Sequence, residues 1–169
     1  MTPLSTELLR RFDVAGPRYT SYPTADRFVE AFGPADLAGA LAQRRATGQS
    51  QPLSLYVHIP FCESLCNYCA CNKIITRKHD RAAAYLRNLQ QEVALYAQHL
   101  GTDRPVSQLH LGGGTPTFLT DAELGKLMDI LRRGFRLMPG GEYSIEVDPP
   151  LPDPYGAVSQ VRDILLANM

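Results

Sequence analysis

The pattern of hydrophobic and polar positions predicts a regular series of elements from residue 53 onward. The segment 53–59, LSLYVHI, is a run of β-branched and aromatic residues ended by Pro60, which indicates a strand. Two similar runs, VSQLHL at 106–111 and EYSIEVD at 142–148, predict a second and a third strand. Each run is followed by residues of a different period, so the strands are separated by other elements.

Helical periodicity fills the spaces between these strands. The segment 79–100 is amphipathic and is closed by Gly101, and Thr120 with Glu123 forms a capping-box signature for a second helix. A third helix is predicted over 158–169. The predicted apolar faces are Ala82, Tyr85, Leu86, Leu89, Val93, Tyr96 and Leu100; then Leu124, Leu127, Met128 and Leu131; then Val158, Val161, Leu165 and Leu166.

The first fifty residues follow no such rhythm. The segment 15–28, AGPRYTSYPTADRF, has two prolines and no sustained period, which predicts an extended arm. The segment 33–49 is predicted to be helical, with Pro34 in its first turn and Gly48 as a stop signal. Its expected apolar side is formed by Leu37, Ala38, Leu41 and Ala42.

Alternating strands and helices imply βαβ units with a parallel sheet, an α/β fold. Ligands bind such sheets at the carboxyl ends of the strands. Three chemically suggestive segments follow predicted strands: a cysteine-rich loop after 53–59, GGGTPT at 112–117, and Glu146-Val147-Asp148. We therefore expect these segments to meet along one edge of the sheet.

Composition narrows the classes of function. The 169 residues are enough for one domain or one domain with an arm, and 17 basic residues balance 17 acidic ones. This neutral chain gives no electrostatic case for binding nucleic acid or an anionic membrane. No run approaches the roughly 18 apolar residues of a membrane span, and the N-terminus does not have a signal-peptide pattern. A reducing cytoplasm is the expected compartment, where clustered thiols bind metal or perform redox chemistry more often than they form disulfides.

All four cysteines lie within ten positions, at Cys62, Cys66, Cys69 and Cys71. Cys-x₃-Cys-x₂-Cys offers three thiolates on one loop, which suits an iron–sulfur cluster with one iron left open for a small molecule. A zinc site completed by a histidine is the second interpretation, and disulfides or uncombined thiols are the third. The spacing favours the cluster.

The residues around this loop have two interpretations each. Tyr56 and Tyr68 either pack as ordinary aromatic residues or stack on an adenine-sized ligand. The glycines of GGGTPT either form a simple turn or let the backbone approach a ligand. Glu146 is either a solvated charge at a strand end or a partner for ribose hydroxyls or an ammonium group.

A family resemblance can be placed on these residues. YVHIPFCESLCNYCACNK at 56–73 resembles the cluster loop of radical S-adenosylmethionine (SAM) enzymes, and LHLGGGTPT at 109–117 resembles their glycine motif. GPRYTSYPT at 16–24, together with Cys71, is similar to one branch, the bacterial oxygen-independent coproporphyrinogen III oxidases. The resemblance runs from about residue 10 to residue 149. The related haem-chaperone branch normally lacks the arm and the fourth cysteine.

The resemblance implies roles for individual residues. Cys62, Cys66 and Cys69 would bind a [4Fe–4S] cluster whose open iron holds SAM, and Cys71 would be a catalytic residue that is not a cluster ligand. Arg18 and Tyr19, in the arm, would lie near the substrate. The implied SAM contacts are Tyr56, Tyr68, Gly113, Gly114, Thr115 and Glu146.

The implied reaction is the oxidative decarboxylation of coproporphyrinogen III to protoporphyrinogen IX without oxygen, in haem biosynthesis. In it, a 5′-deoxyadenosyl radical takes a hydrogen atom from a propionate β-carbon. The implied partners are this small-molecule substrate and an unidentified electron donor, with a monomeric state in the full-length family. A haem chaperone and a non-catalytic metal-binding module remain the alternatives.

The chain is expected to be a truncated form of such an enzyme. Its predicted parts are an N-terminal arm and helix (1–50), a partial radical SAM (β/α) barrel of about three βα units (51–149), and a divergent tail (150–169). Three strands would leave an open sheet edge and one uncovered face. We expect such a chain to assemble a cluster but to turn over substrate poorly or not at all.

Overall fold

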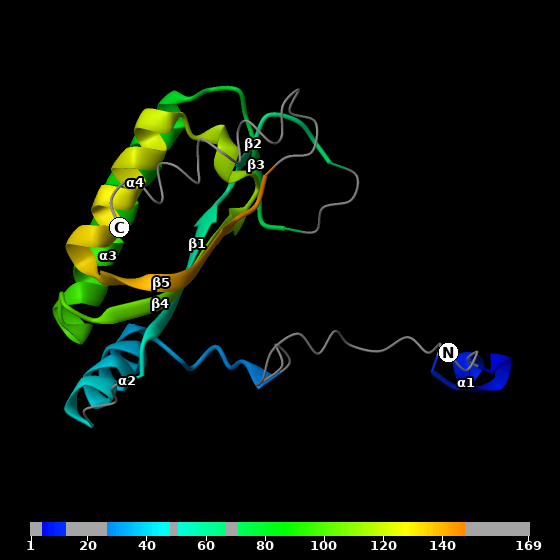
Figure 1. Ribbon diagram of the computed structural model, residues 1–169, viewed down its shortest axis with the longest axis horizontal. Coiled ribbons are helices and arrows are strands. Elements are labelled where there is room, and N and C mark those ends of the chain that lie inside the picture. The colour runs from blue at the N-terminus through cyan, green and yellow to red at the C-terminus, as the bar shows by residue number, and fades with distance from the viewer. Residues whose placement is uncertain (1–4, 13–26, 48–50, 67–70, 148–169) are drawn as a thin grey trace. The chain divides into compact units, whose positions relative to one another are not determined.

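The computed structural model describes residues 5–12, 27–47, 51–66 and 71–147 (Figure 1). The predicted helix at 158–169, most of the predicted arm, and Gly48, Arg18, Tyr19, Tyr68, Cys69 and Asp148 lie outside these residues. The chain forms two compact units, Met1–Leu37 and Ala38–Met169. The first contains helix α1 (Thr6–Phe12) and the start of α2, and the second contains every strand. The predicted three-part division of the chain stays a prediction.

Three parallel strands form the central sheet, in the order β1 (Leu53–Ile59), β4 (Pro105–Gly113), β5 (Arg136–Ile145). The prediction of a parallel α/β sheet is confirmed, and β1 has the predicted bounds. The parallel order is consistent with the connections, because α3 returns the chain between β1 and β4, and α4 returns it between β4 and β5. The first two strands thus lie side by side along their whole length.

The third strand was predicted at 142–148 but begins earlier and ends earlier. Val106 faces Leu137 and Gln108 faces Glu142, so residues 138–141 form a bulge opposite Ser107 alone. Gly140 within the bulge has φ 73°, a left-handed conformation that glycine adopts without strain. The proline and the two glycines of 138–141 are why periodicity alone did not indicate a strand there.

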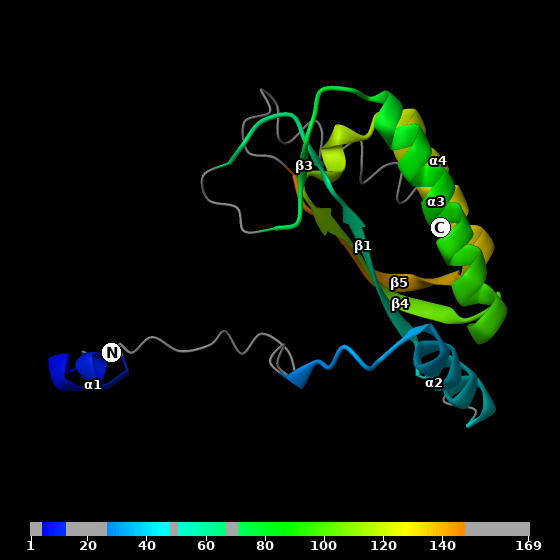
Figure 2. The same cartoon turned by 180° about the vertical axis from the view of Figure 1, so that it is seen from behind.

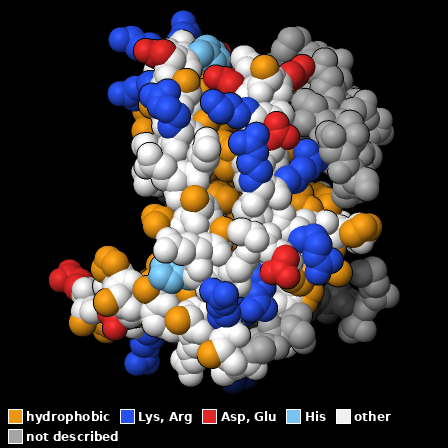
Figure 3. All heavy atoms as spheres, turned by 90° about the vertical axis from the view of Figure 1, so that its left-hand side faces the viewer, with side chains coloured by type: hydrophobic (Ala, Val, Ile, Leu, Met, Phe, Trp, Pro, Cys, Tyr) orange, Lys and Arg blue, Asp and Glu red, His pale blue; other side chains and the backbone are white. Residues whose placement is uncertain are grey.

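Helices α3 (Asp80–Leu100) and α4 (Asp121–Gly134) lie together over one face of the sheet (Figures 1 and 2). Both confirm predicted helices, and the capping box at Thr120 and Glu123 is present. The core between these layers is formed by Val57, Ile59, Ala82, Leu86, Val93, Leu100, Val106, Leu109, Leu111, Leu124, Leu127, Met128, Ile130 and Leu131, among others. The outer side of α3 and α4 carries charged side chains, as expected of amphipathic helices, together with some exposed hydrophobic ones (Figure 3).

Helix α2 (Pro34–Ala46) is confirmed as a helix; on its predicted apolar side Ala38 and Leu41 are partly buried, whereas Leu37 and Ala42 are exposed. None of its residues is buried, and Leu37 is 39% exposed. Only Leu41 packs partly against the core. Alanine and glycine occupy most of the remaining apolar positions, so the helix has little apolar side-chain surface to bury. Across the described residues, no helix is both long and apolar enough to cross a membrane.

The second face of the sheet is polar among the described residues. Because side chains alternate along a strand, β1 presents Ser54, Tyr56 and His58 on this face. The neighbouring positions are Gln108 and His110 on β4, and Glu142 and Ser144 on β5. The expected uncovered face is therefore a hydrogen-bonded surface rather than a hydrophobic one.

A second, two-stranded sheet was not predicted. β2 (Phe61–Cys62) pairs in parallel with β3 (Ile74–Ile75). The Ile74 N–H donates to the Pro60 carbonyl at 2.7 Å, and the Thr76 N–H donates to the Cys62 carbonyl at 2.9 Å. This pair joins the two ends of the cysteine loop, so the loop starts and ends at fixed points.

Candidate cofactor-binding site

The three segments predicted to share one edge of the sheet do meet there. The Gly114 N–H donates to the Ile59 carbonyl and the Thr115 N–H donates to the Phe61 carbonyl, both at 2.8 Å. On the other side, the Gly113 N–H donates to Glu146 Oε2 at 3.2 Å. The glycine turn is thus hydrogen-bonded both to the start of the cysteine loop and to the acidic end of β5.

Two of the three glycines are required by contacts within the protein. A Cβ on Gly114 would lie 2.6 Å from the Phe61 carbonyl oxygen and 2.8 Å from Cys62 Sγ. A Cβ on Gly113 would lie 2.7 Å from the Ile59 carbonyl oxygen, and its φ of 118° also favours glycine. These glycines bring the turn against the cysteine loop, and a role in approaching a ligand stays a prediction.

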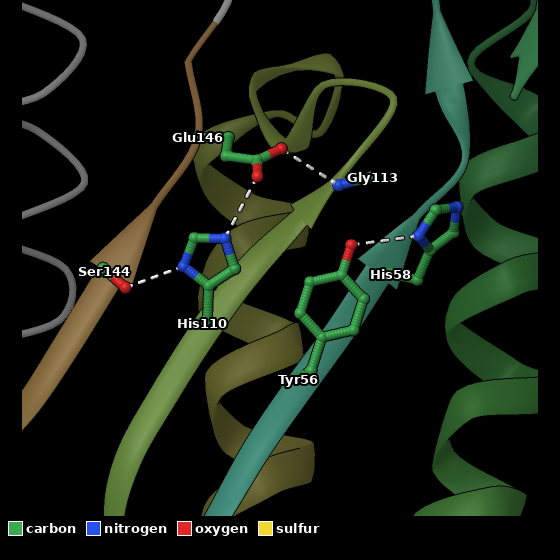
Figure 4. A network of polar contacts seen from close by, with 6 residues as sticks. All are labelled: Tyr56, His58, His110, Gly113, Ser144 and Glu146. Atoms are coloured by element: carbon green, nitrogen blue, oxygen red, sulfur yellow. Dashed lines mark hydrogen bonds and ion pairs between the residues drawn. The ribbon is translucent and has the colours of Figure 1, made fainter. Parts of the chain in front are cut away.

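Gly112 alone faces the polar side of the sheet. A Cβ there would lie 3.0 Å from His110 Nε2, 3.0 Å from Tyr56 Cε2 and 3.1 Å from Glu146 Cδ. The three side chains therefore converge over Gly112. Figure 4 shows Tyr56, His110 and Glu146 near the carboxyl end of β4. Such a polar cluster beside a cysteine loop has the composition of a site for a ligand with hydroxyl or amino groups.

The described thiols fit the donor set of an iron–sulfur cluster. Cys62 is half-buried, Cys66 and Cys71 are exposed, and no disulfide joins these three cysteines. Among the described residues, no three ligating side chains converge on a metal position. The predicted trio includes Cys69, which lies outside those residues, so the trio stays a prediction.

The two histidines that could have completed a zinc site have other partners. His58 contacts Tyr56 Oη through Nδ1 at 3.1 Å and the Asn72 carbonyl oxygen through Nε2 at 2.8 Å. His79 stacks on Phe118 with ring centroids 4.5 Å apart. Its Nε2 lies 3.7 Å from Glu63 Oε1. These contacts favour a site in which sulfur alone supplies the protein ligands.

Tyr56 lies on β1, at one side of the polar face, opposite His110 on β4. A carbonyl oxygen only accepts, so His58 Nε2 donates to Asn72, and in the neutral imidazole Nδ1 accepts from the Tyr56 hydroxyl. The pKa of Tyr56 is raised above that of free tyrosine. Partial burial is the largest cause, and the negative charges of Glu146 and Cys71 add to it. The phenol therefore stays protonated at neutral pH.

Thr115 is the one buried polar residue of the described chain, with 8% of its surface exposed. Its hydroxyl lies 2.9 Å from that of Thr117, and its backbone N–H holds the cysteine loop as described above. Thr115 therefore fixes the path of the turn. The structure brings together Tyr56, Gly113, Gly114, Thr115 and Glu146 from the predicted SAM contacts, whereas Tyr68 lies outside the described residues.

Known proteins share the motifs of this site. The profile of the Radical SAM superfamily matches residues 56–167, which include both motifs and most of the segment predicted to be divergent. The chain belongs to the radical SAM superfamily. Radical SAM enzymes bind a [4Fe–4S] cluster and S-adenosylmethionine, the two cofactors expected from the cysteine loop and the glycine motif.

The most similar relatives include oxygen-independent coproporphyrinogen III oxidases. The Pseudomonas aeruginosa protein is 52% identical over 145 residues, covering 85% of this chain and 31% of the relative. The Mannheimia haemolytica protein is 44% identical over 142 residues, covering 84% of this chain and 94% of the relative.

A solved structure is also similar: the Escherichia coli coproporphyrinogen III oxidase, described as a radical SAM enzyme. It has a TM-score of 0.74 and 44% identity, covering 90% of this chain and 33% of that one. This radical SAM chain thus spans about a third of the length of the Pseudomonas and Escherichia proteins.

Proposed function

We propose that this chain forms the cluster- and SAM-binding part of an oxygen-independent coproporphyrinogen III oxidase of haem biosynthesis. The supporting observation is that hydrogen bonds join the glycine turn to Ile59 and Phe61, just before Cys62, and to Glu146, in a chain 52% identical to such an enzyme. We further propose that it works in the cytoplasm with an electron donor of unknown identity, because a reducing compartment keeps such thiols available for iron.

In this proposal Cys62, Cys66 and Cys69 bind the cluster, and Cys71 is a catalytic residue that does not bind iron. When bound, the cluster and SAM supply an electron and a carbon-centred radical, which is chemistry that protein side chains lack. The protein contributes a loop closed at its base by the β2–β3 pair, which brings the first cysteine against the glycine turn. The radical needs a water-excluding site, and the described strands supply only one wall of it.

The polar face would bind the nucleoside and amino-acid parts of SAM. Glu146 presents a carboxylate that can accept hydrogen bonds from ribose hydroxyls, as acidic residues at strand ends do in nucleoside sites. Tyr56 presents a protonated hydroxyl beside it, and Tyr68 is proposed to lie against the same ligand. The backbone of Gly113, Gly114 and Thr115 completes the set.

The proposed substrate carries four carboxylates, so cationic side chains must lie near its site. Arg18 is our hypothesis for one of them, because it lies in the arm that resembles the oxidase branch. An Arg18→Ala substitution should weaken binding of coproporphyrinogen III, measured by fluorescence quenching under anaerobic conditions. Unchanged affinity would remove Arg18 from the set.

Anaerobic reconstitution tests the proposal. When the chain is supplied with iron and sulfide, it should take up both in equal amounts and show broad visible absorbance. The loaded chain should then bind SAM, as measured by calorimetry. Glu146→Gln should keep the cluster but bind SAM about tenfold more weakly, because a charge-assisted hydrogen bond becomes a weaker neutral one. A colourless zinc protein, or a cluster-loaded chain without affinity for SAM, would contradict the proposal. We expect little or no protoporphyrinogen from this chain alone, measured against a full-length relative.

A further inference from the structure

His110 joins the two polar groups that the proposed function assigns to SAM. It lies on β4 between Tyr56 on β1 and Ser144 on β5, in register with both strands (Figure 4). Its Nε2 is 3.2 Å from Glu146 Oε1, and its Nδ1 is 2.7 Å from Ser144 Oγ. Its ring stacks on that of Tyr56, with centroids 5.7 Å apart and 15° between the planes. His110 is not among the site residues predicted from the sequence.

The hydrogen bonds of His110 have a defined direction. An ionised carboxylate only accepts hydrogen bonds. Nε2 of His110 therefore carries a proton and donates a hydrogen bond to Glu146. In the neutral ring Nδ1 then accepts from the Ser144 hydroxyl, and in the charged ring it donates to the same oxygen. Ser144 thus holds the ring in place in either protonation state, and Nε2 always faces Glu146.

Glu146 is fixed from two sides as a result. One carboxylate oxygen accepts from the Gly113 N–H and the other from His110. The side chain of Glu146 follows the last residue of β5 and is half-exposed, so these two bonds decide where it points. Without His110, rotation about the Glu146 side chain would be limited by the Gly113 N–H alone.

We infer that His110 is a positioning residue for SAM: it orients the Glu146 carboxylate toward the ribose hydroxyls and supports the Tyr56 ring. This inference rests on the proposed function. His110 itself need not touch the ligand, because its two nitrogens are engaged by Glu146 and Ser144. Its effect on affinity therefore passes through Glu146.

The test compares His110→Phe, Glu146→Gln and the double variant in the cluster-loaded full chain. Phenylalanine keeps the stacking ring and removes both hydrogen bonds. The probes are SAM and its analogue without ribose hydroxyls, the 2′,3′-dideoxyadenosyl compound, with affinities from calorimetry and from the ligand-induced change in the spectrum of the reduced cluster. Gln108→Leu is the matched control: Gln108 makes two side-chain bonds on the same face, to Ser54 and to Glu142.

Each single variant should lose about tenfold in affinity for SAM. The double variant should bind no more weakly than Glu146→Gln, because both substitutions remove one and the same interaction. The analogue should bind equally to the wild type and to His110→Phe. Gln108→Leu should change SAM affinity less than about twofold, since it does not contact Glu146.

Other results would overturn the inference. It is wrong if His110→Phe binds SAM as tightly as the wild type does. It is also wrong if the double variant loses the product of the two single losses in SAM affinity, or if His110→Phe weakens binding of the analogue as much as binding of SAM. A wild-type, cluster-loaded chain that binds no SAM would overturn this inference and the proposed function together. If His110→Phe does not fold, Ser144→Ala replaces it. The affinity of Ser144→Ala for SAM should fall about threefold and its affinity for the analogue should not change. An unchanged affinity for SAM would refute the inference.

Discussion

A methyl group on Gly114 should separate the glycine turn from the cysteine loop. In Gly114→Ala the added Cβ would meet the Phe61 carbonyl oxygen at 2.6 Å, Cys62 Sγ at 2.8 Å and the Pro60 carbonyl carbon at 2.9 Å. Two of these are backbone atoms, so no side-chain rotation relieves the contact. The φ of Gly114 is not among the positive values, so contact alone sets the effect.

The size of the effect follows from these contacts. Normal contact between non-bonded heavy atoms is about 3.5 Å, so the turn must move by roughly 0.6–0.9 Å. That shift lengthens the hydrogen bonds from Gly114 to Ile59 and from Thr115 to Phe61. Overpacking costs about 1–3 kcal/mol, and each weakened bond costs up to about 1 kcal/mol. We expect the free energy of unfolding to fall by about 2–4 kcal/mol.

Cluster assembly should fail along with stability, because Cys62 is one of the displaced groups. The assay is urea unfolding of the metal-free chain, followed by iron and sulfide analysis after anaerobic reconstitution. Gly125→Ala is the control: nothing lies within 4 Å of its Cβ position, and it is inside α4. That change should stabilise the chain by about 0.5–1 kcal/mol and leave iron uptake unchanged. Wild-type stability and iron uptake in Gly114→Ala would refute this reasoning.

Three further predictions concern other parts of the chain. Cys71→Ser should take up as much iron and sulfide as the wild type whereas Cys69→Ser should not, and iron analysis that ranks them equally would contradict the assigned ligands. Tyr85 donates to the His58 carbonyl at 2.6 Å, so Tyr85→Phe should lower the free energy of unfolding by about 1 kcal/mol at neutral pH. Burial raises the pKa of Tyr85 from 10.0 to about 12, so the folded state holds this proton more tightly than the unfolded state. The resulting stability is complete below pH 10 and is lost as the pH rises to 12; urea unfolding across that range should vary less in Tyr85→Phe. Thr120→Ala removes the capping box and should cost about 1 kcal/mol, and an unchanged urea midpoint would show that the cap contributes nothing.

The sequence predicted those features that depend on neighbours along the chain. β1, α3 and α4 are set by the period of their apolar residues, and the start of α4 by a capping box of four residues. The shared edge was also predictable, because parallel strands have their carboxyl ends on the same side. The start of β5 was not predicted, because the bulge there depends on pairing with β4, and the small apolar residues of α2 bury little surface against the core.

By itself, then, the sequence determined the α/β class, the order of the elements and the candidate ligands on the cysteine loop, because spacing and residue type act locally. Only the tertiary structure decided which side chains from different strands share one face. His110 forms a cluster with Tyr56, Ser144 and Glu146 because strand register sets them side by side. Gly114 is required because a distant loop passes within contact distance. Register and close approach between segments far apart in sequence depend on the packing of the whole sheet, which no local pattern encodes.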